Sequence, residues 1–189
     1  DLVSGDFYWF TGYSGKTNSG EKSHRHHIRL SNIPQNENGF IITAADCTGH
    51  GVPGAFMSMI GFNLLETISR SGITEPNEIL NELHKSVRYL LKQNHSDNRD
   101  GMDIAICVVK DNGKRVEFSG AKNPLFYITN GELFHIKGDS VPIGGIQKES
   151  QRVFTLHSID VTAPTCFYIF SDGYTDQFGG ADASKFSTK

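Results

Sequence analysis

Two neighbouring segments with apolar residues at helical spacing constrain the fold of this chain more than any other feature. The first follows the turn Gly49-His50-Gly51 and has Pro53 near its first turn, which favours a helix start there. The second follows Thr74, which we expect to cap it. The apolar positions are Val52, Ala55, Phe56, Met59, Ile60, Leu64 and Ile68, then Ile79, Leu80, Leu83, Val87, Leu90 and Leu91. Two amphipathic helices in sequence predict a helical layer.

Short runs with strand character lie on both sides of these helices. Residues 3–10 mix aromatic and β-branched side chains, and residues 40–45 form an almost unbroken apolar run, typical of a strand buried on both faces. The turns Asp111-Asn112-Gly113 and Asn130-Gly131 predict hairpins in the second half. The strands expected there are residues 104–109, 115–118, 125–129, 132–136 and 166–170. The sequence therefore predicts an α+β fold, in which helices cover a sheet or a pair of sheets.

Length and charge set limits on the function. The 189 residues fit one globular domain, and the formal net charge of -3 supplies no field that would attract nucleic acid or anionic lipid. No apolar run of roughly 18 residues and no N-terminal signal pattern occur, so we expect no membrane contact from this segment. The three cysteines are far apart and lack CxxC spacing, which argues against a zinc site and favours a reducing, cytoplasmic compartment.

Two aspartates stand directly at the ends of apolar strands. Asp46 follows residues 40–45 and Asp172 follows residues 166–171, while Asp6 is a third carboxylate beside a glycine. An ionised carboxylate near a core is costly unless it is paired, hydrogen-bonded or bound to a cation, and no Lys or Arg is adjacent in sequence. Oxygen ligands suit Mg²⁺ or Mn²⁺ better than zinc. The alternative is that Asp46 and Asp172 are ordinary turn residues beside glycines.

Five segments carry motifs in a fixed order along nearly the whole chain. They read VSGDFY at residues 3–8, DCTGHGVPGA at 46–55, DGMDIA at 100–105, PIGG at 142–145 and SDGYTDQFGG at 171–180. This set resembles the bacterial SpoIIE-type branch of the PPM metal-dependent protein serine/threonine phosphatases. The resemblance implies a four-layer α-β-β-α sandwich, with two central antiparallel sheets flanked by helices and a metal pair at one end.

The resemblance also assigns roles to individual residues. It implies that Asp46 bridges two Mn²⁺ or Mg²⁺ ions, that Asp6 and the backbone carbonyl of Cys47 complete one metal site, and that Asp172 belongs to the other. A water between the ions would attack the phosphorus of phosphoserine or phosphothreonine. His50 lies four residues after Asp46, where it could protonate the leaving oxygen. A turn residue that orients the loop is an equal alternative for His50.

The expected substrate is a regulatory phosphoprotein, for example an anti-sigma-factor antagonist, under the control of a fused sensor domain. Residues 1–189 begin inside a motif and end without a final apolar element, so we expect a single phosphatase domain truncated at both ends from a longer signalling protein. The Asp-Asp pair that usually closes the family's domain does not occur, which predicts an incomplete site at Asp172 and weak or no activity for this segment.

Three further possibilities concern the function of the fold and the acidic residues. A degenerate phosphatase fold could bind a phosphoprotein and relay a signal without turnover. A structural calcium site is a further possibility, although the chain lacks the ligand spacing of an EF-hand loop. Asp100 and Asp103 could hold an additional metal, but we expect them to lie in a solvated loop before the strand at residues 104–109.

Overall fold

The computed structural model describes residues 5–14, 27–29, 38–175, 178–179 and 184–185. The elements in chain order are β1 (Asp6–Ser14), β2 (His27–Arg29), β3 (Asn38–Cys47), α1 (Gly51–Arg70), α2 (Pro76–Leu90), β4 (Gly101–Lys110), the 3₁₀ turn η1 (Asp111–Gly113), β5 (Arg115–Ala121), β6 (Leu125–Thr129), β7 (Glu132–Ile136), β8 (Ile143–Gly144), β9 (His157–Asp160), β10 (Thr165–Tyr168), α3 (Asp172–Thr175), β11 (Phe178–Gly179) and β12 (Ser184–Lys185).

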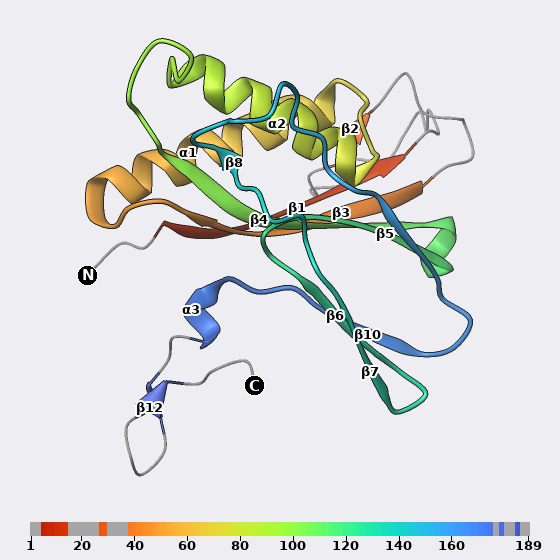
Figure 1. Ribbon diagram of the computed structural model, residues 1–189. Coiled ribbons are helices and arrows are strands. Elements are labelled where there is room, and N and C mark those ends of the chain that lie inside the picture. The colour runs from red at the N-terminus through yellow and green to blue at the C-terminus, as the bar shows by residue number, and fades with distance from the viewer. Residues whose placement is uncertain (1–4, 15–26, 30–37, 176–177, 180–183, 186–189) are drawn as a thin grey trace.

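Two sheets form the centre of the molecule. The larger, sheet A, has the order β2-β1-β3-β4-β5-β9, with β8 added beside β4; its pairs are antiparallel except for β1 with β2. The smaller, sheet B, has the antiparallel order β10-β6-β7. Figure 1 shows α1 and α2 over one face of sheet A, and sheet B on the other side. The predicted α+β sandwich with two central sheets is confirmed, and the described residues supply one of its two expected helical layers.

One hydrophobic core fills the space between the two long helices and sheet A. The stripe of α2 enters it as predicted, because Ile79, Leu80, Leu83 and Val87 are almost completely buried. Burying each of these aliphatic side chains contributes about 1.5–3 kcal/mol. Helix α2 begins at Pro76 with Glu75 as the N-cap residue, so the predicted Thr74 cap is wrong. Among the helices that the structure describes, none is long and apolar enough to cross a membrane.

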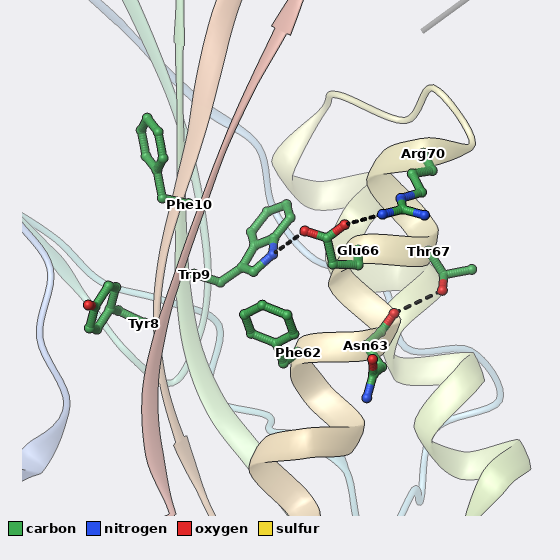
Figure 2. A pocket seen from close by; sticks show the side chains of 8 residues that line it. All are labelled: Tyr8, Trp9, Phe10, Phe62, Asn63, Glu66, Thr67 and Arg70. Atoms are coloured by element: carbon green, nitrogen blue, oxygen red, sulfur yellow. Dashed lines mark hydrogen bonds and ion pairs between the residues drawn. The ribbon is translucent and has the colours of Figure 1, made fainter. Parts of the chain in front are cut away.

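Trp9 connects β1 to α1 through its burial and a hydrogen bond. Its side chain is buried on the helical side of β1, and its indole Nε1 donates a hydrogen bond of 3.2 Å to Glu66 of α1 (Figure 2). Tyr8 and Phe10 point to the opposite side of the strand and are mainly exposed. Since alternate residues of a strand share a face, Asp6 lies on the same face as Tyr8 and Phe10, away from the helices.

A second core lies between the two sheets. Its buried members come from β4, β5 and the start of β6, and include Cys107, Phe118 and Leu125. Strand β3 does not contribute to this core among the described residues, and Phe40 and Ile42 are more than one third exposed on that face. The prediction that residues 40–45 are buried on both faces is therefore wrong, because sheet B covers β4 and β5 rather than β3.

Candidate active site

Strand register brings the first two aspartates together. In the antiparallel pair of β1 and β3, Asp6 stands directly opposite Asp46. Asp172 is the first residue of α3, which follows β10 of sheet B in the chain. Carboxylate oxygens of Asp6, Asp46 and Asp172 all lie within 4.8 Å of one another, with Asp46 half-buried and the other two exposed. Three carboxylates that are up to 166 positions apart in sequence thus form one cluster where β1, β3 and α3 meet.

Small residues allow these segments to approach so closely. A Cβ atom added at Gly5 would lie 2.5 Å from the carbonyl oxygen of Cys47, and one at Gly173 would lie 2.8 Å from Oδ2 of Asp6. Ser171 donates a hydrogen bond of 3.1 Å from its Oγ to the same Oδ2. The glycines that follow or precede the aspartates in sequence therefore have a packing role, in addition to any role in turns.

Burial and mutual repulsion oppose ionisation within this cluster. The pKa of Asp46 is raised to about 7, mainly by burial, then by the charge and hydrogen bond of Asp172 and by the corresponding interactions with Asp6. Three carboxylates this close cannot all be ionised at low cost unless positive charge is added. An all-oxygen donor set with excess negative charge fits a hard divalent cation such as Mg²⁺ or Mn²⁺.

The thiol of Cys47 is unsuited to act as a nucleophile. The pKa of the thiol is raised to about 12, mainly by burial; a hydrogen bond from Ser58 lowers it in part, and the charges of Asp46 and Asp6 add to the increase. The thiol therefore stays protonated at physiological pH and is a poor nucleophile. The carbonyl oxygen of the same residue lies at the end of β3, against Gly5.

The loop after β3 is tied to the start of β4. The backbone N–H of Thr48 donates to the carbonyl oxygen of Gly101 at 2.9 Å, and the Thr48 hydroxyl donates to Asp100 at 3.1 Å. Asn98 holds the other carboxylate oxygen of Asp100 at 2.8 Å. Asp100 therefore fixes the position of the chain that carries Cys47, and it is not part of the carboxylate cluster. His50 is exposed at the N-cap position of α1 and lies outside that cluster as well.

Asp103 and Lys122 lie beside the cluster, a position that their place in the sequence did not reveal. Strand β4 begins at Gly101, so Asp103 lies inside the strand and stands opposite Asp46; its expected place in a solvated loop is wrong. Burial raises the pKa of Asp103, while Lys122 lowers it through an ion pair of 3.2 Å between Nζ and Oδ2. The alternation of Asp103 with Ala105 and Cys107 was the available signal, because it continues the period of the strand toward its start.

A pocket of about 410 Å³ opens beside Asp46 and Cys47. Lys122 and Arg99 supply its cationic side chains, and Ile146 contributes an apolar wall. Two larger pockets, of about 570 and 540 Å³, lie beside α1 and α2, and none of the three clustered aspartates lines either of them (Figure 2 shows the first). The pocket that shares a wall with the carboxylate cluster is therefore the one suited to a reacting ligand.

This chain shares its fold with PP2C-type phosphatase domains of known structure. Residues 36–188 match the family described as Stage II sporulation protein E (SpoIIE). The chain belongs to the SpoIIE family, which confirms the resemblance inferred from its motifs. Comparison with curated proteins finds no match.

Solved structures with the same fold extend this result. The SiaA-PP2C domain of Pseudomonas aeruginosa superimposes with a TM-score of 0.71 at 26% identity, over 100% of this chain and 63% of that one. The PP2C phosphatase domain of SpoIIE from Bacillus subtilis, with a fragment of its regulatory domain, gives a TM-score of 0.61 at 20% identity, over 94% and 44%. RsbX in complex with magnesium gives 0.57 at 15% identity, over 91% and 68%. The chain thus spans about two thirds or less of these structures.

Proposed function

We propose that this chain is the catalytic domain of a metal-dependent protein phosphatase that hydrolyses phosphoserine or phosphothreonine. The observation that carries the proposal is the convergence of Asp6, Asp46 and Asp172 within 4.8 Å, in a chain of the SpoIIE family. As substrate we propose a cytoplasmic regulatory phosphoprotein of the anti-sigma-factor-antagonist kind, with a fused sensor domain controlling the reaction. In one similar structure, that of SpoIIE from Bacillus subtilis, the PP2C phosphatase domain is accompanied by a fragment of a regulatory domain, which supports control by a fused domain.

The residues at the cluster suit two divalent cations, Mn²⁺ or Mg²⁺. Asp46 faces both Asp6 and Asp172, so its two carboxylate oxygens could each hold one ion. Asp6 and the carbonyl oxygen of Cys47 would complete the first site, and Asp172 the second. When bound, the two cations supply Lewis acidity, which activates a shared water and stabilises the charge that develops on the phosphoryl oxygens.

The protein's remaining task is to place the substrate and to move a proton. Water oxygen forms a bond to phosphorus while the bond to the seryl or threonyl oxygen breaks, and the leaving oxygen requires a proton. His50 is our proposed donor, because it is exposed four residues beyond Asp46 on the loop that leads into α1. No covalent phosphoenzyme is needed, in agreement with the protonated thiol of Cys47.

The test is phosphate release by the full-length protein from a phosphoserine protein and from p-nitrophenyl phosphate, with and without Mn²⁺. We expect activity that requires the metal and falls roughly a hundredfold or more in Asp46→Asn, because this change removes the carboxylate shared by both sites. Asp160→Asn is the matched control, since Asp160 is exposed on β9 at the other edge of sheet A. Metal-independent activity, or full activity in Asp46→Asn, would contradict the proposal. Tight phosphoprotein binding without release would instead support a binding module.

A further inference from the structure

A row of charged side chains crosses sheet A at the level of the carboxylate cluster. Asp6 on β1 stands opposite Asp46 on β3, which stands opposite Asp103 on β4. The next pair in register joins Ile104 to Ala121 at the end of β5, so Lys122 follows in line with Asp103. Partners in register point to the same face of a sheet. The row therefore presents three carboxylates and ends in one ammonium group.

The backbone around Lys122 is fixed in an uncommon conformation. Its φ is +62°, in the left-handed region that non-glycine residues rarely occupy. The backbone N–H of Lys122 donates to the carbonyl oxygen of Asp139 at 2.7 Å, and that of Asp139 donates to Gly120 at 2.8 Å. A turn held in this way gives the lysine side chain a defined origin. A residue of high conformational cost at the edge of a pocket points to a role for its side chain.

The ammonium group of Lys122 is held between the carboxylate row and the pocket. Asp103 accepts one hydrogen bond from it at 3.2 Å. An ammonium group carries three N–H donors, so this contact orients the group without using its full capacity. The side chain also lines the pocket of about 410 Å³ that Asp46 and Cys47 border, and it is 46% exposed. A ligand in that pocket can therefore reach both Lys122 and the carboxylate cluster.

Charge balance indicates what this ligand is. Two divalent cations at the cluster would balance the carboxylates of Asp6, Asp46, Asp103 and Asp172. A phosphoryl dianion would then add two negative charges, and Lys122 and Arg99 are the cationic side chains among the described residues that line the pocket. Hydrogen bonds from an ammonium group to a phosphate are charge-assisted and among the stronger ones that proteins make.

We infer that Lys122 binds the phosphoryl group of the substrate in the pocket beside Asp46, with Asp103 as the residue that positions its ammonium group. The inference rests on the proposed phosphatase function and adds a substrate-binding residue that is not a metal ligand. It also explains why a lysine stands at a left-handed position where glycine would fit more easily.

The test measures the affinity of the full-length protein for inorganic phosphate in saturating Mg²⁺. Calorimetric titration gives this value whether or not the protein turns over, and competition against p-nitrophenyl phosphate gives it independently. We expect Lys122→Met and Lys122→Gly to weaken phosphate binding roughly tenfold, as the loss of one charge-assisted hydrogen bond predicts. Lys122→Arg should stay within about threefold of wild type, because it keeps the charge.

Two features of the design separate a binding role from a structural one. Glycine accepts a φ of +62° without strain, so Lys122→Gly is expected to fold even if Lys122→Met is destabilised. Lys85→Met is the matched control, because Lys85 is an exposed lysine in a surface ion pair with Glu82 on α2. It should leave phosphate affinity unchanged. Mg²⁺ affinity is measured in each variant, and we expect Lys122→Gly to bind the metal at least as well as wild type.

The outcomes distinguish this inference from the proposed function. Normal phosphate affinity in Lys122→Gly, in a protein that hydrolyses phosphoserine, would overturn the role of Lys122 alone. A parallel loss of Mg²⁺ and phosphate affinity would also overturn it, since the lysine would then act through the metal site. A wild-type protein that binds phosphate through Lys122 without hydrolysing any substrate would support the inference and contradict the phosphatase function. No phosphate binding by wild type in Mg²⁺ would overturn the inference.

Discussion

Asp46 has a carboxyl group whose ionised form is destabilised by burial and by two neighbouring carboxylates. Its pKa rises from an ordinary value of 3.8 to about 7, so between these values the folded protein retains a proton that the unfolded chain has released. The free energy of unfolding of the metal-free protein must therefore decrease as pH rises through this window. A residue that costs stability and lies beside two other carboxylates is typical of a site kept for binding or catalysis.

Removing this carboxylate should stabilise the metal-free protein. We expect Asp46→Asn to raise the free energy of unfolding at pH 8 by about 1 kcal/mol, a value discounted because Asp46 is only half-buried. The gain should shrink at pH 5, where most of the wild-type Asp46 is already protonated in the folded state. Thermal unfolding in a chelator at both pH values measures the effect, with Asp160→Asn as the control. A lower melting temperature for Asp46→Asn at pH 8 would show that the repulsion is not relieved.

Residues of the site differ in how visible they are from the sequence. Asp46 and Asp172 could be found because each ends an apolar run, where an unpaired carboxylate requires a partner. The period of the strand could place Asp103 inside β4, but its position opposite Asp46, and that of Lys122 beside it, depend on the pairing of β3 with β4 and of β4 with β5. Cross-strand register is a tertiary property, and a shift of one residue would move these side chains to the other face.

At the scale of elements, one buried arginine holds the loop that forms a wall of the pocket. The guanidinium group of Arg152 donates to the carbonyl oxygens of Pro142 at 2.7 Å, Gly144 at 3.0 Å and Ile146 at 2.9 Å, and it pairs with Glu149. From α2, His84 accepts a hydrogen bond of 3.0 Å from the N–H of Gly144. Strand β8, which lies within this loop, pairs with the start of β4. Helix α2 and β4 are thereby joined through the loop.

Loss of this arginine should destabilise the whole domain. We expect Arg152→Met to lower the free energy of unfolding by about 3 kcal/mol, because it leaves three carbonyl oxygens without their donor in a nearly buried position. Arg70→Met is the control, since Arg70 is 71% exposed and forms a surface ion pair with Glu66; its effect should stay within about 0.5 kcal/mol. Urea unfolding monitored by tryptophan fluorescence compares the two. Equal midpoints would mean that the loop does not depend on Arg152.

Local signals predicted elements better than they predicted what covers them. The hairpin at Asn130-Gly131 forms as expected, because both residues adopt the positive φ that this tight turn requires. The apolar run at residues 40–45 predicted a strand correctly but not its exposed side chains, Phe40 and Ile42. Hydrophobicity shows that a strand needs cover, whereas the lateral position of sheet B over sheet A depends on contacts between distant residues.

At the scale of the molecule, the candidate metal site combines two residues of sheet A with one that follows the last strand of sheet B. Asp6 and Asp46 belong to sheet A, and Asp172 follows β10 of sheet B. The two sheets otherwise meet through a core that involves β4, β5 and β6. Cations held by all three aspartates would therefore add a second connection between the sheets, on the side where β1 and β3 lie. In this arrangement, binding of the cations would depend on the relative position of the two sheets. The stability of the fold and the occupancy of the site would then be coupled.

This coupling predicts that metal binding slows hydrogen exchange in sheet B. With Mg²⁺ at about one hundred times its dissociation constant, exchange of the amides of β10 that open with the site should slow by up to about a hundredfold. Asp172→Asn should abolish most of this protection in β10 while leaving part of it in β1 and β3, because Asp6 and Asp46 still face one another. Mass spectrometry of wild type and variant, with and without Mg²⁺, measures both effects, and β9 at the far edge of sheet A serves as the internal control. Equal protection of β10 in the two proteins would mean that the cations bind to sheet A alone and that Asp172 does not connect the sheets.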